Sequence, residues 1–206
     1  MVRRTKAEAE QTYHELLDAA VILFLRQGIA NTSLKDIADL AGKTRGAIYW
    51  HFDNKDSVVQ ALWQRNAETY HQSLTKMASA IETEDPAKSF RQEIKNLIQN
   101  LLGDEEFGKV LRIVIHSVEF TDEHTLLQNF LTDKKSDFIL ALKSSIEMLQ
   151  RQHKIRVKLS SELLSQALFS YIHGLVDNYL KPGHDSLDLV KDGDVLIDMF
   201  LDSILQ

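Results

Sequence analysis

The chain has 206 residues, of which 44% are hydrophobic, which suffices for a sizeable core in one small and one larger domain. It contains no cysteine, which excludes disulfides, thiolate zinc sites and thiol redox sensing. No apolar run approaches the ~20 residues of a membrane span and the amino terminus lacks a signal-peptide core. We therefore expect a cytoplasmic protein with no membrane partner.

Charge is distributed unevenly along the chain. The net charge is −6, yet residues 1–66 carry nine cationic and eight acidic side chains, a net charge of +1, which leaves −7 for the other 140 residues. Such a distribution is compatible with DNA binding by the amino-terminal region, because the local field matters more than the total charge. The acidic remainder is expected to repel DNA and so to confine contact to that region.

Hydrophobic periodicity, with only 2 prolines and 8 glycines, predicts an all-α fold. The first helix covers about residues 7–27 and ends at Gly28, and two short helices follow within residues 33–52. The later helices are expected at about residues 54–77, 86–102, 105–117, 123–152, 161–180 and 187–205. We place a domain boundary at the start of the long helix, giving domains 1–53 and 54–206 with no linker between them.

The two short helices form the most informative motif. Ser33 and Asp36 are spaced to cap the first helix, and Gly42 marks a tight turn. Thr44 is placed to cap the second helix, which buries Ala47 and Ile48. This is the layout of a helix-turn-helix whose second helix enters the major groove of DNA.

Residues 44–52, Thr-Arg-Gly-Ala-Ile-Tyr-Trp-His-Phe, resemble the recognition segment of the TetR family of transcriptional regulators, most closely its AcrR-like branch, which governs multidrug efflux pumps. The basic residues 3–6 and the pair Asn54-Lys55 fit the same pattern. The resemblance implies an amino-terminal three-helix DNA-binding domain and a carboxy-terminal helical ligand-binding and dimerisation domain. It also implies a repressor that binds a palindromic operator as a dimer and is released by hydrophobic drug-like effectors.

Within the motif, Arg45 is the strongest base-reading residue, since a guanidinium grips guanine bidentately, although a phosphate contact is the alternative. Trp50 and Phe52 are more often core residues than contacts. Lys43 departs from the branch, which usually has a small apolar residue there, and adds a phosphate contact or alters base preference. The candidate DNA-binding residues are Arg3, Arg4, Ser33, Lys43, Thr44, Arg45, Gly46, Tyr49, Trp50, His51 and Lys55.

Several of these residues have a second interpretation. Arg3 and Arg4 belong either to an arm that enters the minor groove or to a disordered tail. Thr44 is either a contact or only a cap. Lys55 either meets a phosphate at the start of its helix or is an ordinary solvated lysine.

The last two predicted helices carry apolar stripes wider than one core needs. They are either a fully buried pair or, as the resemblance implies, half of a four-helix dimer interface. The candidate interface residues are Leu164, Leu168, Tyr171, Leu175, Tyr179, Ile197, Phe200, Leu201 and Ile204.

The resemblance implies an effector pocket between the middle helices, where polar residues on apolar faces are the candidates. His116 and His173 are either pocket residues or satisfied core histidines. Protonation of a pocket histidine would make effector binding depend on pH. The candidate effector-binding residues are Asn66, Tyr70, Phe107, His116, Glu119, Phe138, Phe169, His173 and Asp177.

Other functions fit the sequence less well. His116, Glu119, Asp122, Glu123 and His124 lie close together, but the spacing signatures of zinc and di-iron sites are absent, as are phosphate loops and nucleophile elbows. We expect neither an enzyme nor a metal or cofactor. A TetR-type regulator of a catabolic or signalling operon, or a helical scaffold that binds a protein, remains as an alternative.

Overall fold

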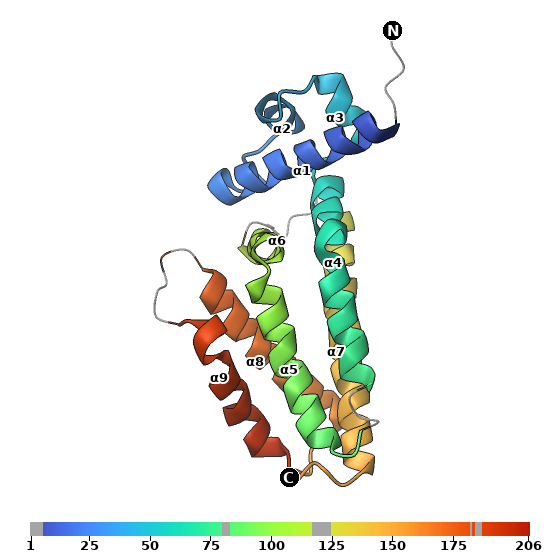
Figure 1. Ribbon diagram of the computed structural model, residues 1–206, viewed down its shortest axis with the longest axis vertical. Helices are drawn as coiled ribbons and strands as arrows, with labels where there is room; N and C mark the ends of the chain where they lie inside the picture. Colours follow the sequence, from blue (N-terminus) through green and yellow to red (C-terminus); the bar gives the residue numbers. More distant parts are fainter. Residues whose placement is uncertain (1–5, 80–82, 117–124, 182, 184–186) are drawn as a thin grey trace. The chain divides into compact units, whose positions relative to one another are not determined.

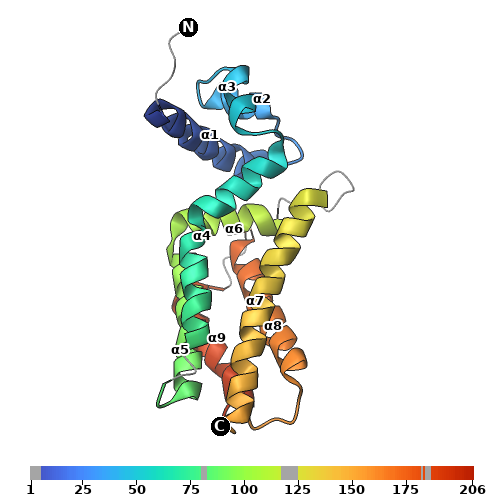
Figure 2. The same cartoon turned by 90° about the vertical axis from the view of Figure 1, so that its right-hand side faces the viewer.

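The computed structural model describes residues 6–79, 83–116, 125–181, 183 and 187–206, and in these residues the chain forms α-helices and no β-strand (Figures 1 and 2). The helices are α1 (Lys6–Gln27), α2 (Leu34–Leu40), α3 (Arg45–His51), α4 (Lys55–Ser79), α5 (Pro86–Gly103), α6 (Glu105–His116), α7 (Thr125–Arg151), α8 (Ser161–Leu180) and α9 (Leu189–Ile204). The predicted all-α fold is confirmed, and the predicted helix ends fall within two residues of the observed ones.

The chain divides into two compact units. Unit 1 comprises residues 1–66 and 109–130, and unit 2 comprises residues 67–108 and 131–206. Helix α4 runs without interruption from Lys55 to Ser79 and therefore contributes to both units. The predicted boundary between residues 53 and 54 stays a prediction.

In unit 1, the predicted apolar stripe of α1 forms the centre of the core. Leu16, Leu17, Ala20 and Phe24 have no exposed surface, and Ile37 of α2, Ile48 of α3 and Leu62 of α4 are equally buried. Gly28 ends α1 with a φ of 79°, in the left-handed region that favours glycine. The short helices α2 and α3 are thereby held by burial against α1 rather than by their own helical propensity.

In unit 2, helices α5 and α9 pack along each other (Figure 1). Their shared core includes Phe90 and Ile94 of α5 and Leu201 of α9, which have no exposed surface. At the rim of this contact Asp198 of α9 binds Arg91 at 2.8 Å and Lys95 at 2.7 Å. Both cations favour the ionised carboxylate, so that the pKa of Asp198 is held below its ordinary value of 3.8, chiefly by Lys95 and then by Arg91.

We expect Asp198→Asn to lower the free energy of unfolding by about 0.5–1 kcal/mol at pH 7, since half-exposed ion pairs are screened by solvent. Because the pKa is depressed in the folded state, this contribution is present above pH 3.8 and is lost as pH falls through the folded-state value. Urea denaturation of both proteins between pH 7 and pH 3 measures the difference. A gap that stays constant or widens below pH 3.8 would contradict this prediction.

Candidate nucleic-acid interface

The two helices of the helix-turn-helix begin at the caps that the sequence predicts. The Asp36 amide donates to Ser33 Oγ at 3.1 Å and the Ser33 amide donates to Asp36 Oδ2 at 2.8 Å, a complete capping box. Gly42 makes the turn with a φ of 65°. The Ala47 amide donates to Thr44 Oγ1 at 3.2 Å and starts α3. The predicted motif is confirmed down to its hydrogen bonds.

Helix α3 buries Ala47 and Ile48 and exposes the rest of its first turns. Arg45 and Gly46 are exposed, and the Arg45 guanidinium lies 5.3 Å from the ring centre of the half-exposed Tyr49. This cation–π contact holds both side chains on the outer side of the helix. The exposed side of α3 thus combines a planar cation with an aromatic hydroxyl, groups suited to base edges and phosphates.

Trp50 and Phe52 differ, although burial tendencies favoured the core for both. Phe52 is buried as expected, whereas the prediction was wrong for Trp50, whose side chain is 73% exposed. The reason is helical geometry, because Ala47 and Ile48 already define the buried side of this seven-residue helix and Trp50 lies away from it. Trp50 packs edge-on against the half-buried His51, with 4.5 Å between ring centres.

Tyr13 of α1 supports the end of α3, although it is not among the residues predicted from the sequence. Its ring stacks on Phe52 with 5.3 Å between centres, and His51 lies 5.6 Å away. Burial raises the pKa of the Tyr13 hydroxyl above its ordinary value of 10.0. The available signal was its position three residues before Leu16, on the side of α1 that faces the core.

Lys43, in the turn before α3, forms an ion pair with Glu15 of α1. Gln11 donates to the other carboxylate oxygen of Glu15 at 3.0 Å. Hydrogen bonds from Lys43 and then Gln11 hold the pKa of Glu15 below its ordinary value of 4.5. Lys43 is therefore paired with an acid of the same chain, and the pair ties the turn to α1.

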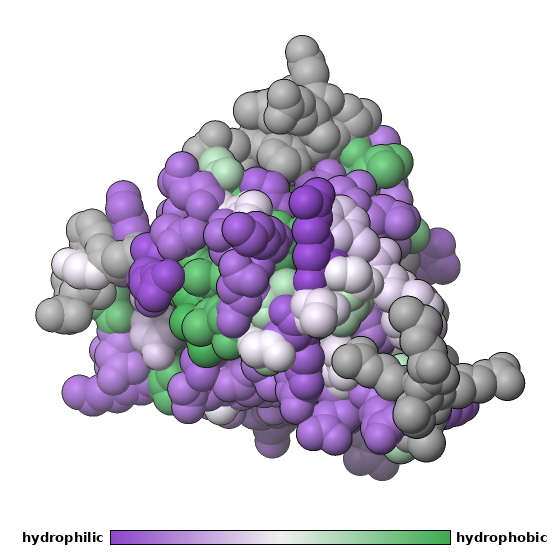
Figure 3. All heavy atoms as spheres, turned by 90° about the horizontal axis from the view of Figure 1, so that it is seen from above, coloured by the Kyte–Doolittle hydropathy of each residue, from purple (hydrophilic) through white to green (hydrophobic). Residues whose placement is uncertain are grey.

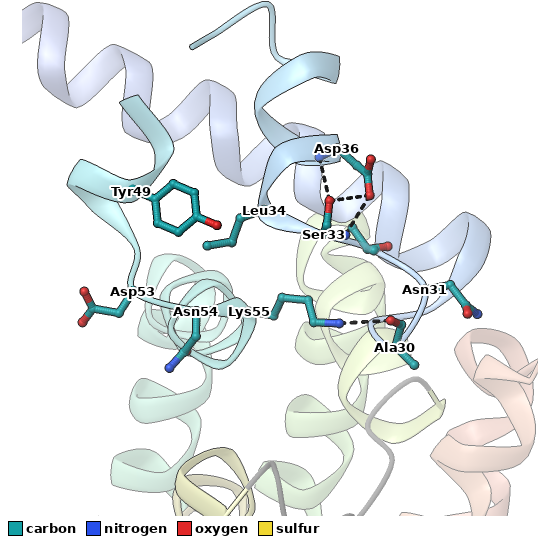
Figure 4. Close-up of a pocket in the computed structure, with 10 residues that line it drawn as sticks. Ala30, Asn31, Ser33, Leu34, Asp36, Tyr49, Asp53, Asn54 and Lys55 are labelled. Carbon is teal, nitrogen blue, oxygen red and sulfur yellow. Dashed lines mark hydrogen bonds between the residues drawn. The ribbon is translucent and has the colours of Figure 1, made fainter. Parts of the chain in front are cut away.

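An open pocket of about 490 Å³ lies between the α1–α2 loop, the start of α2, the last turn of α3 and the first turn of α4. Figure 4 shows Tyr49 beside Leu34 on one side and Lys55 reaching across to Ala30 on the other. Lys55 Nζ donates to the carbonyl oxygens of Ile29 at 2.6 Å and Ala30 at 3.1 Å. Lys55 is therefore not an ordinary solvated lysine, and its contact with a DNA phosphate stays a prediction.

Arg3 and Arg4 lie outside the described residues, so the predicted arm stays a prediction. Ser33 is exposed and caps α2. Seen from above, the surface in Figure 3 is mostly hydrophilic, with a smaller group of hydrophobic side chains among the polar ones.

The predicted effector residues fall in both units. Within unit 2, Tyr70 of α4, Phe138 of α7 and Phe169 of α8 form an edge-to-face series, with ring centres 6.5 and 5.7 Å apart. His173 continues the series at 5.6 Å from Phe169, and Lys135 Nζ lies 5.4 Å from the Phe169 ring centre. These aromatic residues therefore do lie together.

The hydroxyl of Tyr70 donates to the Lys134 carbonyl at 3.0 Å, and burial followed by the charge of Asp137 raises its pKa above the ordinary value. Phe107 is fully buried and Asp177 half-buried in unit 2, while Asn66 and His116 belong to unit 1. Glu119 lies outside the described residues, as do Asp122, Glu123 and His124.

Of the two interpretations of His116 and His173, the satisfied core histidine is wrong because both side chains are exposed, and the role in an effector pocket stays a prediction. His116 is the last residue of α6, and His173 lies beside the exposed Gly174 in α8. Neither side chain is thus enclosed by apolar neighbours.

The predicted dimer stripe needs a correction, because five of its nine residues are already buried within one chain. These are Leu164, Leu168, Ile197, Leu201 and Ile204. Tyr171 stacks on Phe200 at 5.0 Å and its hydroxyl donates to the Leu196 carbonyl at 2.8 Å, which joins α8 to α9. Leu175 and Tyr179 are half-buried. The five buried residues therefore pack α8 and α9 into their own protomer, and a dimer contact by the other four stays a prediction.

Large apolar side chains on these helices are instead exposed on other sides. Leu163 of α8 is 54% exposed, and Val195 and Met199 of α9 are 71% and 65% exposed. The spacing of four residues between Val195 and Met199 puts both on one side of α9. This pattern was present in the sequence, but the longer buried stripe beside it obscured it.

Two family descriptions match the chain. Residues 16–62 match "Bacterial regulatory proteins, tetR family", and residues 85–206 match "MAATS-type transcriptional repressor, C-terminal region". The chain belongs to the TetR family. The first match covers the helix-turn-helix and its supporting helices, and the second covers α5 to α9.

Full-length relatives of this TetR-family regulator agree. It is 36% identical to the HTH-type transcriptional regulator TtgR of Pseudomonas putida over 99% of this chain and 96% of that protein. It is 30% identical to the HTH-type transcriptional regulator AcrR of Shigella flexneri over 98% of this chain and 94% of that protein. The predicted resemblance to the AcrR-like branch is confirmed.

A solved structure resembles this regulator over nearly its whole length. NalD of Pseudomonas aeruginosa, described as the secondary repressor of the MexAB-OprM multidrug efflux pump, has a TM-score of 0.86 and 27% identity over 98% of this chain and 99% of its own. The family consists of transcriptional regulators rather than enzymes. Among the described residues, no helix combines the length and apolar character that a membrane span requires.

Proposed function

We propose that this regulator is a cytoplasmic, ligand-responsive repressor that binds a palindromic operator as a dimer and controls a multidrug efflux operon. The observation that carries the proposal is α3, where capping and burial are satisfied by Thr44, Ala47 and Ile48 while Arg45 and Tyr49 stay exposed. The similarity to NalD, described as a repressor of an efflux pump, supports the choice of target.

A dimer is proposed because one seven-residue recognition helix buries too little surface for specific binding. The exposed Leu163, Val195 and Met199 provide apolar surface on α8 and α9 that a second copy of the chain would cover. In a twofold dimer each of these residues contributes to the interface from both copies of the chain. Two recognition helices would then read half-sites about one helical turn apart, ~34–36 Å.

A hydrophobic, aromatic effector is proposed to act on unit 2. The series of Tyr70, Phe138, Phe169 and His173 supplies ring faces and edges for stacking, and it joins α4, α7 and α8. A ligand that inserts into this series would move α4, whose amino-terminal part belongs to unit 1. Binding would relieve repression only through a higher affinity for the conformation that fits DNA less well.

Selection of genomic fragments by the purified protein tests this function. We expect enrichment of a palindromic fragment next to a transporter operon, with an affinity for that fragment that falls steeply as salt increases. Drug-like aromatic compounds should then release the protein from that fragment. A protein that prefers no duplex over scrambled competitor at moderate salt is not this repressor, and a fragment beside a catabolic operon would exclude efflux control.

The ion pair of Lys43 with Glu15 leads to a prediction about non-specific binding. We expect Glu15→Gln to increase affinity for random DNA roughly two- to fivefold, because it releases the charge of Lys43 next to α3. Fluorescence anisotropy with random and operator duplexes measures the change. Glu10→Gln, which removes an exposed acid from α1 without touching Lys43, is the matched control. Equal gains for the two variants would show that net charge alone is responsible.

A further inference from the structure

The last turn of α3 packs against aromatic rings, one of which belongs to α1. The Tyr13 ring of α1 stacks on the Phe52 ring, with 5.3 Å between centres and 24° between planes. The His51 ring lies 5.6 Å from the Tyr13 ring and 4.5 Å from the ring of the exposed Trp50. Tyr13 thus begins a series of contacts that continues through His51 to Trp50.

The end of α3 depends on these contacts more than its start does. At the start, Thr44 caps the helix and Ala47 and Ile48 are buried. The structure describes all of α3, and none of its last three residues is buried. A seven-residue helix has little stability of its own. Its last turn is therefore held by the buried Phe52, which follows it, and by the rings that pack there.

Tyr13 acts on α3 by packing and not by charge. Burial raises the pKa of its hydroxyl above 10.0, although the charge of Arg65 opposes this shift, so the side chain is neutral at pH 7. Aromatic pairs in stacked or edge-on geometry are favoured beyond the area that they bury. His51 is one of the candidate DNA-binding residues, and a ring that is already held in one orientation loses less conformational freedom when it binds.

We infer that Tyr13 is a positioning residue for DNA binding, whose ring holds the imidazole of His51 in the orientation in which the end of α3 meets a backbone phosphate. The inference rests on the proposed DNA-binding function and on the predicted contact by His51. It makes two separable statements. Operator affinity depends on the ring of Tyr13 and not on its hydroxyl, and this dependence acts through His51.

Operator titrations at fixed salt, well below the unfolding temperature, test the first statement. We expect Tyr13→Leu, which removes the ring, to raise Kd about fivefold. Tyr13→Phe keeps the ring and loses only the hydroxyl, so its Kd should stay within about twofold of the original value. His14→Leu is the matched control, because it removes an exposed ring 5.5 Å from Tyr13 on α1 itself; its Kd should also stay within about twofold.

A double-mutant cycle with His51→Ala tests the second statement. A purely structural role of Tyr13 would weaken operator binding to the same extent whether or not His51 is present. If Tyr13 acts through His51, Tyr13→Leu should change Kd by less than about twofold once His51 is alanine, because the group that it orients is gone.

Three results overturn the inference. An operator Kd that Tyr13→Leu leaves unchanged would show that the ring serves folding only. An equal rise in Tyr13→Phe or His14→Leu would show that the ring contact with α3 is not the cause. A rise of about fivefold that persists in His51→Ala would show that Tyr13 does not act through His51.

A second variant keeps the test decisive if Tyr13→Leu does not fold. Tyr13→Met then replaces it with the same expected result, because an unbranched, flexible side chain fills irregular space without supplying a ring. Urea denaturation of each variant shows that the protein is folded under the conditions of the titration. Should the unsubstituted protein prefer no duplex, the proposed function fails, which is a separate outcome.

Discussion

Replacing Arg45 with alanine is expected to weaken operator binding by about 1–3 kcal/mol for each half-site and to relax sequence preference at the base pair it reads. The side chain is exposed in the first turn of α3 and is held by its contact with Tyr49, 5.3 Å from the ring centre. A guanidinium held in this way loses little conformational freedom when it meets a base edge. Binding titrations with the operator and with variants changed at single base pairs measure the effect.

Arg45→Lys is the matched control, because it keeps the charge and loses the planar fork. If Arg45 reads a base, the lysine variant retains the salt dependence of the original protein but loses discrimination between base pairs. An equal loss of affinity for operator and random DNA in Arg45→Ala would reduce Arg45 to a backbone contact. The two variants together separate the contribution of base reading from that of electrostatic attraction to the phosphates.

We expect Met199→Glu to prevent formation of the proposed dimer and to abolish operator binding at concentrations where the original protein binds. Met199 is 65% exposed beside Val195 on α9, so the substitution should leave the fold of the protomer intact. In a twofold interface it buries two carboxylates, each of which costs several kcal/mol without a partner. The dissociation constant of the dimer should therefore rise by at least about 100-fold, which sedimentation equilibrium measures.

Val190→Glu provides the control on the same helix. Val190 is also exposed, but it precedes Met199 by nine residues and so points to the opposite side of α9. This variant should remain dimeric and bind the operator. A dimer that survives Met199→Glu, or a monomer produced equally by Val190→Glu, would exclude the proposed face. Circular dichroism of both variants confirms that the helices are retained.

Local patterns allowed the helices and caps to be predicted from the sequence. Ser33 with Asp36, Thr44, and the glycines at positions 28 and 42 act through bonds and backbone angles within four residues of themselves. The buried stripe of α1 follows equally from a spacing of three and four residues. Such signals are complete in a short segment of chain, and they also carry the resemblance to the TetR family.

Assignments that depend on what a side chain meets across the fold could not be read in this way. An apolar stripe on α8 and α9 shows that a surface is covered but not by what, and only the packed structure reveals that Leu164 and Leu201 are covered by their own protomer while Met199 is not. The prediction for Trp50 was wrong for a related reason. Burial tendency is an average over proteins, whereas the side of a short helix on which a residue lies depends on its position in that helix.

The sequence by itself determined the helical fold, the helix-turn-helix with its caps, and the family, because each depends on short-range periodicity or on a contiguous motif. Only the tertiary structure decided the partners of the cations. Lys43 meets Glu15, 28 residues earlier, and Lys55 meets Ile29 and Ala30 in the loop after α1. A residue and its ionic or hydrogen-bonded partner lie within a few ångströms in space, but they can be far apart along the chain. The charge of a residue therefore does not tell whether it contacts DNA or stabilises the helix-turn-helix.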